Sequence, residues 1–225
     1  MDYFSKKRII VVGATGAFGQ LVAQRLRELG ADPLLVSRGR QPLPSDLTDL
    51  PSAVADVTSR EQVSAALSTL AAGQPVDGII NCAGVVAFGS FAEVSAEVTR
   101  ELFAVNSEGV INLISLAGDV VAPGGFLASF TGVAADMTIM GMGAYCASKT
   151  AAKSALAIAA RELRSKKISV LDIRAPHTET GLVTRALAGT APTMPAGLDP
   201  AVVVERVLTA LAAGEKDLPA EAFSA

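Results

Sequence analysis

The sequence predicts an α/β fold: a doubly wound domain in which a parallel sheet of about six to seven strands has helices on both faces. Three observations predict it, namely a length of 225 residues, a hydrophobic fraction of 50% and apolar runs that recur between longer helical patterns. This length suits one large domain, and a charged fraction of 18% is too low for a disordered chain. We therefore expect a single domain over residues 1–225.

Short apolar runs are expected to form the strands. They are nearly continuous in apolar residues, without regular polar alternation, which is typical of strands covered on both faces. Helical stretches of a crossover's length separate most of them, as parallel strands require. The runs cover residues 8–12, 34–37, 52–57, 77–84, 124–130 and 168–176, and a stub for a seventh strand lies within 216–225.

Two helical patterns show a stripe that faces the core. Val22, Leu26 and Leu29 recur at helical spacing, and a longer stripe runs from Leu102 through Asn106 to Ala117. The only stretch rich in proline and glycine follows the last long strand. We expect residues 177–198 to form a mobile loop, and no linker-like break marks a second domain.

Composition excludes several classes of protein. Nineteen Lys and Arg against 22 Asp and Glu leave a net charge of −3, so no basic excess favours nucleic acid. Cys82 and Cys146 stand far apart with no companion cysteine, which argues against a disulfide framework or a zinc site. No apolar stretch reaches the length of a spanning helix and no secretory signal is evident. We expect a soluble cytoplasmic protein without a metal or a membrane partner.

A glycine turn follows the first predicted strand and opens the first helix. Its glycines are Gly13, Gly16 and Gly19, spaced GxxGxxG. Backbone N–H groups and the helix dipole at such a turn can receive a pyrophosphate. Glycines also serve tight turns that bind nothing, so this pattern alone leaves both interpretations open.

The end of the second strand bears on the choice of cofactor. An acid at this point usually binds the ribose 2′-hydroxyl of NAD, whereas this chain has Ser37 and Arg38, with Arg40 close by. A cation there suits a 2′-phosphate. We therefore expect NADP(H) rather than NAD(H), the alternative being a solvated arginine in a turn.

Tyr145 and Lys149 form the pattern YxxxK. Residues four apart on a helix project from one face, so the phenol and the ammonium become neighbours. A nearby positive charge stabilises phenolate and lowers the phenol pKa, as a proton-transfer group requires. A chance pair on a solvated helix is the alternative.

Together these motifs resemble the short-chain dehydrogenase/reductase family over about residues 8–176. The resemblance implies a Rossmann fold, a nicotinamide dinucleotide and an Asn-Ser-Tyr-Lys catalytic set. Tyr145 and Lys149 supply the last two members, and Asn106 matches the first. The cofactor-binding residues that we expect are Gly13, Thr15, Gly16, Ala17, Phe18, Gly19, Ser37, Arg38, Asp56, Val57, Asn81, Ala83, Gly84, Tyr145, Lys149, Pro176, His177 and Thr178.

Several positions depart from the family pattern. Thr131 and Ser129 are both candidates for the catalytic serine, and we favour Thr131 because the run that follows it is similar to the family's turn. His177 follows Pro176 where the family has glycine, and Cys82 replaces an asparagine of the segment around Asn81. Asn106 has an alternative interpretation as a core residue bonded to nearby backbone.

The resemblance implies hydride transfer between a carbonyl and an alcohol, with Tyr145 as general acid or base, on a small and largely apolar substrate. The alternatives are a non-catalytic NADP(H)-binding redox-sensing or regulatory protein, and a sugar-nucleotide-modifying enzyme. A homodimer or homotetramer is expected from the family. Candidate pocket walls are Met137, Ile139, Met140, Met142, Leu182, Leu187 and Met194.

Overall fold

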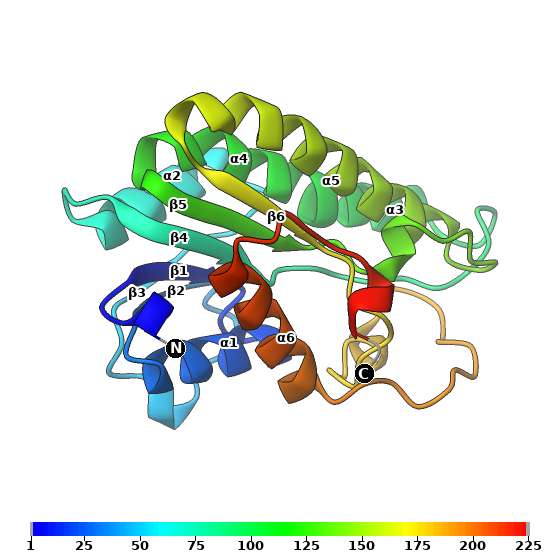
Figure 1. The fold of residues 1–225 in the computed structure, drawn as a ribbon. Helices are drawn as coiled ribbons and strands as arrows, with labels where there is room; N and C mark the ends of the chain where they lie inside the picture. The colour runs from blue at the N-terminus through cyan, green and yellow to red at the C-terminus, as the bar shows by residue number, and fades with distance from the viewer. Residues whose placement is uncertain (1, 224–225) are drawn as a thin grey trace.

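A computed structural model of the chain describes residues 2–223. It contains a parallel sheet of seven strands in the order β3-β2-β1-β4-β5-β6-β7 (Figure 1). The strands are β1 (Arg8–Val12), β2 (Asp32–Ser37), β3 (Ser52–Val54), β4 (Val76–Asn81), β5 (Val121–Phe130), β6 (Ser169–Ile173) and β7 (Asp217–Leu218). The predicted fold class is confirmed. The chain order reverses between β1 and β4, and such a switch point leaves a crevice at the carboxyl ends of the strands.

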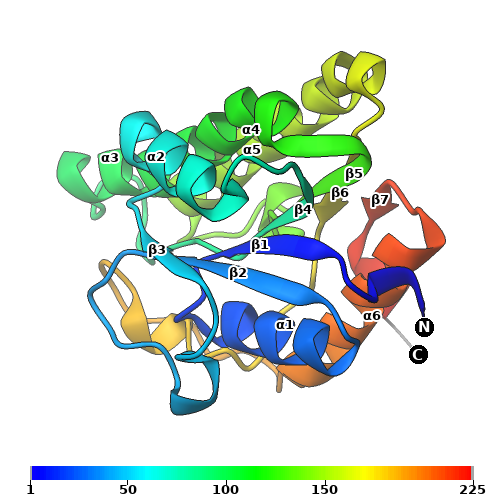
Figure 2. The same cartoon turned by 90° about the vertical axis from the view of Figure 1, so that its left-hand side faces the viewer.

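Helices cover both faces of the sheet. Helices α1 and α6 lie on one face and α2, α4 and α5 on the other (Figures 1 and 2), over two separate apolar clusters. The helices are α1 (Ala17–Glu28), α2 (Arg60–Ala71), α3 (Ala96–Phe103), α4 (Gly109–Val120), α5 (Gly143–Glu162) and α6 (Pro200–Ala213). Within residues 2–223, none is both long and apolar enough to cross a bilayer.

Local sequence explains where three of these helices begin. The side chains of Ser59, Ser95 and Asp199 each accept a hydrogen bond from a backbone N–H in the first turn of α2, α3 and α6. Such caps satisfy donors that the helix itself leaves unpaired. Pro200 follows Asp199 at the start of α6, where its fixed φ suits the helix and its missing N–H costs nothing.

The predicted runs end where β1, β2 and β5 end, but the other three run past the observed strands. The runs predicted at 52–57, 77–84 and 168–176 continue past the last residues of β3, β4 and β6, which are Val54, Asn81 and Ile173. Beyond Asn81 the backbone turns out of the sheet, because the N–H of Ala83 donates to the Asn81 side chain at 3.1 Å. These apolar ends therefore form loops at the edge where the crevice opens.

The predicted stripe from Leu102 to Ala117 is buried, but it spans two helices. Between α3 and α4 lies a π-helical turn, Ala104–Glu108, that contains Asn106. Such turns insert one extra residue into a helix and occur often at functional sites. In the first stripe Val22 and Leu26 are buried, whereas Leu29 caps α1.

The last strand of the sheet, β7, has two residues and lies within the stub predicted at 216–225. Backbone pairing of β7 with β6 is reinforced by Arg174, whose guanidinium donates to both carboxylate oxygens of Asp217 at 2.6 and 2.9 Å. Arg174 also donates to Asp172 at 2.6 Å. Because Arg174 and Asp172 are both buried, this pairing fixes the final strand beside the end of β6.

Residues 177–198 follow β6 and form a loop whose end lies against its own start. Thr178 forms an isolated parallel bridge with Leu198, so the two ends of the segment are held together. Midway, Leu187 N donates to Val86 O at 2.8 Å, which ties the segment to the chain that follows β4. The mobility expected for this segment stays a prediction.

Candidate active site

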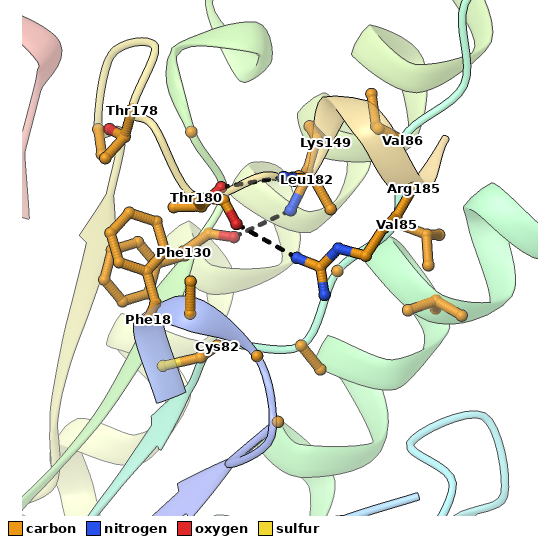
Figure 3. A pocket seen from close by; sticks show the side chains of 18 of the residues that line it. Phe18, Cys82, Val85, Val86, Phe130, Lys149, Thr178, Thr180, Leu182 and Arg185 are labelled. Atoms are coloured by element: carbon orange, nitrogen blue, oxygen red, sulfur yellow. Dashed lines mark hydrogen bonds between the residues drawn. The ribbon is translucent and has the colours of Figure 1, made fainter. Parts of the chain in front are cut away.

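The main cavity opens at the carboxyl edge of the sheet, where the strand order reverses. Its volume is about 440 Å³, within the usual range for small-molecule sites. Walls come from the ends of β1, β2, β4 and β5, from α5 and from the 177–198 segment. Figure 3 shows Phe18, Cys82 and Phe130 on one side and Arg185 with Val85 and Val86 on the other.

The glycine turn forms a bare backbone cradle in this cavity. Gly13 has a φ of +82°, and a Cβ there would lie 2.8 Å from the nitrogen of Ala83. A Cβ on Gly19 would meet the carbonyl oxygen of Gly13 at 2.2 Å, so α1 packs directly on the turn. Only glycine fits at these two positions. The exposed backbone before Ala17, at the N-terminus of α1, fits a dinucleotide phosphate.

Two arginines lie at the β2 side of the cavity. Ser37, Arg38 and Arg40 line it, whereas Asp56 does not. Partial burial opposes ionisation of Asp56, but hydrogen bonds from Thr58 and the charges of Arg38 and Arg40 hold its pKa below the usual value. This carboxylate therefore stays charged near both arginines.

Asn81 and Ser129 lie below the cavity and do not line it. The Asn81 amide donates to the Ser129 hydroxyl oxygen at 3.0 Å, and both side chains are buried. They are register partners on β4 and β5. The pair therefore joins the two central strands just under the floor of the cavity.

Thr131 lines the cavity, but its hydroxyl hydrogen points away from it. The hydroxyl donates to the carboxylate of Asp172, and Thr131 and Asp172 are both buried. An oxygen that donates to one partner keeps its lone pairs for another donor. The residue that follows, Gly132, also lines the cavity and brings no hydroxyl.

Tyr145 and Lys149 lie together on the wall formed by α5. The Lys149 ammonium is 6.0 Å from the centroid of the Tyr145 ring and donates to the carbonyl of Phe130 at 3.0 Å (Figure 3). Burial lowers the pKa of Lys149 to about 8, although the charge of Asp172 opposes this shift. Burial also raises the pKa of the Tyr145 phenol. The sequence predicts a lowered phenol pKa, and the difference arises because desolvation dominates at this position.

Asn106 is buried behind this wall and does not line the cavity. Its amide donates to Val85 O at 2.9 Å and to Ser148 Oγ at 3.0 Å, and its Oδ1 accepts from Val85 N at 3.0 Å. A Cβ on Gly84 would lie 3.3 Å from Lys149 Nζ and 3.4 Å from Asn106 Oδ1. Asn106 therefore holds the backbone at Val85 close to the Lys149 ammonium.

Most of the residues singled out from the sequence meet in this one cavity. The lining members are Gly13, Thr15, Gly16, Ala17, Phe18, Ser37, Arg38, Val57, Ala83, Gly84, Thr131, Tyr145, Lys149, Pro176, His177 and Thr178. Those that lie outside the lining are Gly19, Asp56, Asn81, Asn106 and Ser129. Gly19 packs on Gly13, and Asp56 lies near Arg38 and Arg40. Asn81 and Asn106 accept from the backbone N–H of Ala83 and Val85, and Ser129 accepts from Asn81.

The apolar wall residues divide in the same way. Ile139, Met142, Leu182 and Met194 line the cavity, whereas Met137, Met140 and Leu187 do not. Sequence reasoning missed Phe130, Val85, Val86 and Arg185. Phe130 and Val85 directly precede or follow predicted functional positions and Val86 comes one residue later, which is a usable signal, but Arg185 lies in an irregular segment with no pattern to mark it.

A doubly wound parallel sheet with a glycine cradle at its switch point defines a dinucleotide-binding protein of the Rossmann type. A family model described as "short chain dehydrogenase" matches residues 7–190. The chain therefore belongs to the short-chain dehydrogenase/reductase family, as its motifs predicted. It is an NAD(P)-dependent oxidoreductase of a family that acts on alcohol and carbonyl substrates.

Named relatives and solved structures resemble most of the chain. The 2,3-dihydro-2,3-dihydroxybenzoate dehydrogenase of Escherichia coli K12 is 29% identical over 182 residues, which are 80% of this chain and 72% of that protein. An L-xylulose reductase of Caenorhabditis elegans is 27% identical over 177 residues, 74% of this chain and 70% of that one. A short-chain dehydrogenase of Burkholderia cenocepacia J2315, solved in complex with NADP, has a TM-score of 0.85 and 23% identity, covering 97% and 90% of the two chains.

Proposed function

We propose that this protein is an NADP(H)-dependent oxidoreductase that interconverts a carbonyl and an alcohol on a small, largely apolar substrate, with Tyr145 as the general acid or base. The observation that carries this proposal is the Tyr145 phenol in the cavity wall, next to the buried ammonium of Lys149 and close to the glycine cradle. The apolar lining residues Ile139, Met142 and Leu182 support the assignment of substrate class.

Each residue has a defined task in this mechanism. When bound, the dinucleotide supplies the hydride donor or acceptor. In the reductive direction Tyr145 donates its proton to the substrate oxygen, and its raised pKa keeps that proton in place beforehand. Lys149 stabilises the phenolate that this leaves and binds the nicotinamide ribose. Asn106 is assigned the support of proton return, because its amide holds the backbone at Val85, next to Gly84 and the Lys149 ammonium.

Thr131 is the proposed hydroxyl neighbour of the substrate oxygen, with Ser129 as the alternative. Thr131 lines the cavity and Ser129 does not, which favours Thr131. Because the Thr131 hydroxyl already donates to Asp172, it can accept a hydrogen bond from an alcohol substrate more readily than donate one to a carbonyl.

Replacing Tyr145 with phenylalanine tests the mechanism. We expect Tyr145→Phe to bind NADPH normally and to lose about 10²- to 10⁴-fold or more of kcat, because only the proton donor is removed. Turnover is followed by NADPH absorbance on a panel of ketones and alcohols, with Thr131→Ala and Ser129→Ala in parallel. Wild-type kcat in Tyr145→Phe would refute the mechanism, and a loss confined to Ser129→Ala would reverse the choice of hydroxyl.

The cofactor is proposed to be NADP(H) rather than NAD(H), since Arg38 and Arg40 line the β2 side of the cavity. A guanidinium is well suited to a phosphate. In Arg38→Ala we expect the NADPH-to-NADH ratio of kcat/KM to fall about tenfold or more, in line with one lost charge-assisted contact. An unchanged ratio would contradict the assignment.

A non-catalytic NADP(H)-binding regulatory protein is the second candidate. It is favoured by the engagement of the Thr131 hydroxyl with Asp172 and by His177 in place of the family's glycine. NADPH binding without turnover of any compound in the panel would support it over the enzyme.

We also propose that the protein is located in the cytoplasm and forms a homodimer or homotetramer. Residues 177–198 are proposed as the mobile segment over the substrate, in a single domain.

A further inference from the structure

The main cavity is lined by cations and by no carboxylate. Among residues 2–223, Arg38, Arg40, Lys149 and Arg185 line it, and no aspartate or glutamate does. Charges of one sign in a recessed site concentrate ligands of the opposite sign. The cavity lining therefore favours anions, although Asp56 and Asp172 offset part of the charge of Arg38, Arg40 and Lys149 from outside it.

Three of these cations already have a task in the proposed function. Arg38 and Arg40 belong to the β2 side, where they also act on Asp56, and Lys149 lies beside Tyr145. Arg185 comes from the opposite side, within the 177–198 segment. Nothing in the proposed hydride transfer uses its charge.

Within residues 2–223, the hydrogen bonds of the Arg185 guanidinium go to neutral acceptors. Its Nε donates to Gly181 O at 3.2 Å and its Nη2 to Thr180 O at 3.3 Å. Figure 3 shows the guanidinium extending toward Thr180 and the interior of the pocket. Two carbonyl contacts orient it and leave other N–H groups of the guanidinium to bind both oxygens of a carboxylate.

The neighbouring acids are engaged elsewhere. Asp172 is buried beneath Thr131 and bonded to Arg174. The Glu179 carboxylate accepts from Gly197 N at 2.7 Å and lies 3.5 Å from His177 Nε2. Neither lies within ion-pair distance of Arg185 among the described residues. Its positive charge is therefore available to a ligand.

Apolar side chains line the same cavity as Arg185, whose own side chain is exposed. Val86, Phe88 and Met142 form a small buried cluster, against which Leu182 and Val183 pack from the same segment as Arg185. Leu187 N donates to Val86 O, which ties the segment to the chain after β4 two residues past Arg185. An apolar wall with one oriented guanidinium complements a molecule with an apolar body and one anionic group.

We propose that Arg185 binds a carboxylate on the substrate, so that the enzyme acts on a carbonyl or alcohol compound with an apolar body and a carboxylate end. The inference rests on the proposed function for the placement of the reacting oxygen near Tyr145. It goes beyond that function because it assigns a charge to the substrate and a residue that selects for it.

Ligand binding tests this inference without any turnover. The probes are 4-phenylbutanoate and its uncharged analogue 4-phenylbutanamide, titrated by calorimetry into the protein saturated with NADP⁺. We expect the wild type to prefer the carboxylate. In Arg185→Gln this preference should fall ~10- to 100-fold, as for a lost hydrogen bond to a charged group. Arg185→Lys should keep part of it.

Two controls distinguish a carboxylate site at Arg185 from a cofactor contact and from a general effect of charge. Arg164→Gln removes an exposed arginine outside the cavity and should leave the preference intact. NADPH affinity is measured for each variant, because an Arg185→Gln protein that loses NADPH affinity but keeps the carboxylate preference would make Arg185 a cofactor ligand and overturn the inference. No carboxylate preference in the wild type would overturn it as well.

The binding measurement and a second set of compounds, keto acids with their methyl esters, distinguish the two proposals. If no carbonyl compound is reduced but the carboxylate preference exists and depends on Arg185, the proposed reaction fails and the anion site stands. If keto acids and their methyl esters are reduced with equal kcat/KM by the wild type, the reaction stands and the anion site fails. Phenylpyruvate and 4-oxopentanoate, each with its methyl ester, provide this comparison.

Discussion

Lys149 is a cation in a place that disfavours charge. It is 6% exposed, and burial alone would remove its proton at a pH well below the usual value for lysine. The negative charge of Asp172 counteracts part of this shift. The mechanism needs the protonated form, so the balance between burial and Asp172 decides the pH range in which the site works.

We therefore expect NADPH binding to weaken as the pH rises through about 8. The pKa of Lys149 in the free protein is about 8, so the ammonium is present below this pH and lost above it. NADPH should bind ~10-fold or more weakly at about pH 9.5 than at about pH 7, because a neutral Lys149 amine no longer attracts the negatively charged cofactor. Fluorescence titration of NADPH across this range measures the effect.

The matched variant is Lys149→Met, which keeps an unbranched side chain and removes the charge. Burial raises the pKa values of Tyr145 and Cys82, so neither group titrates in this range. The variant should bind NADPH weakly and with little dependence on pH. A pH dependence as steep as that of the wild type would mean that another group causes it.

Single residues differ in how far the sequence predicts their roles. Spacing alone places Tyr145 beside Lys149, because both lie on one helix. The Thr131 hydroxyl donates to Asp172 on β6, 41 residues further along the chain. No local sequence pattern predicts such a contact. The direction of the Tyr145 pKa shift also depends on burial by distant segments, which is why the sequence-based expectation was opposite.

Among the elements, the apolar runs predict where the strands lie along the chain, whereas they misplace the ends of β3, β4 and β6. Residues 82–87 after Asn81 are as apolar as those before it, so periodicity gives no signal for where pairing stops there. Pairing stops where side chains compete for the backbone, as Asn81 does for Ala83 N. The misplaced ends matter because they form the cavity wall.

The π-helical turn Ala104–Glu108 is a second feature that periodicity hides. A stripe through Asn106 predicts one regular helix, but the extra residue in this turn rotates the chain between α3 and α4. Asn106 can then bond to Val85 and Ser148 at once. The buried amide thus has its partners, which removes the cost expected for an unpaired polar group in a core.

At the scale of the whole molecule, the sheet ends in short strands on both sides. β3 has three residues and β7 has two, and short edge strands offer little backbone for pairing with another chain. Association through the edges of the sheet is therefore disfavoured. The helices on the α4 and α5 side offer a different surface.

That surface carries apolar side chains in contact with water. Phe103, Ile111 and Ile158, from α3, α4 and α5, are 38%, 49% and 56% exposed. Small residues next to Ile158, such as Ala157 and Ala160, are also exposed, and they allow another helix to approach closely. Helices α3 and α4 both contact α5, so we expect the interface of the proposed homodimer or homotetramer on this side, where apolar side chains are exposed.

We expect the wild type to be an oligomer and Ile158→Lys to dissociate it. In a two-fold dimer the same patch of both subunits forms the interface. Each substitution therefore places a lysine ammonium against the apolar patch of the other subunit, where it loses its water. The dissociation constant should rise ~10-fold or more. Light scattering on a size-exclusion column over a range of concentrations measures the mass.

Val202→Lys is the control, because Val202 is 56% exposed on α6, on the other face of the sheet. A monomeric wild type, or equal dissociation by both variants, would contradict an interface on α4 and α5.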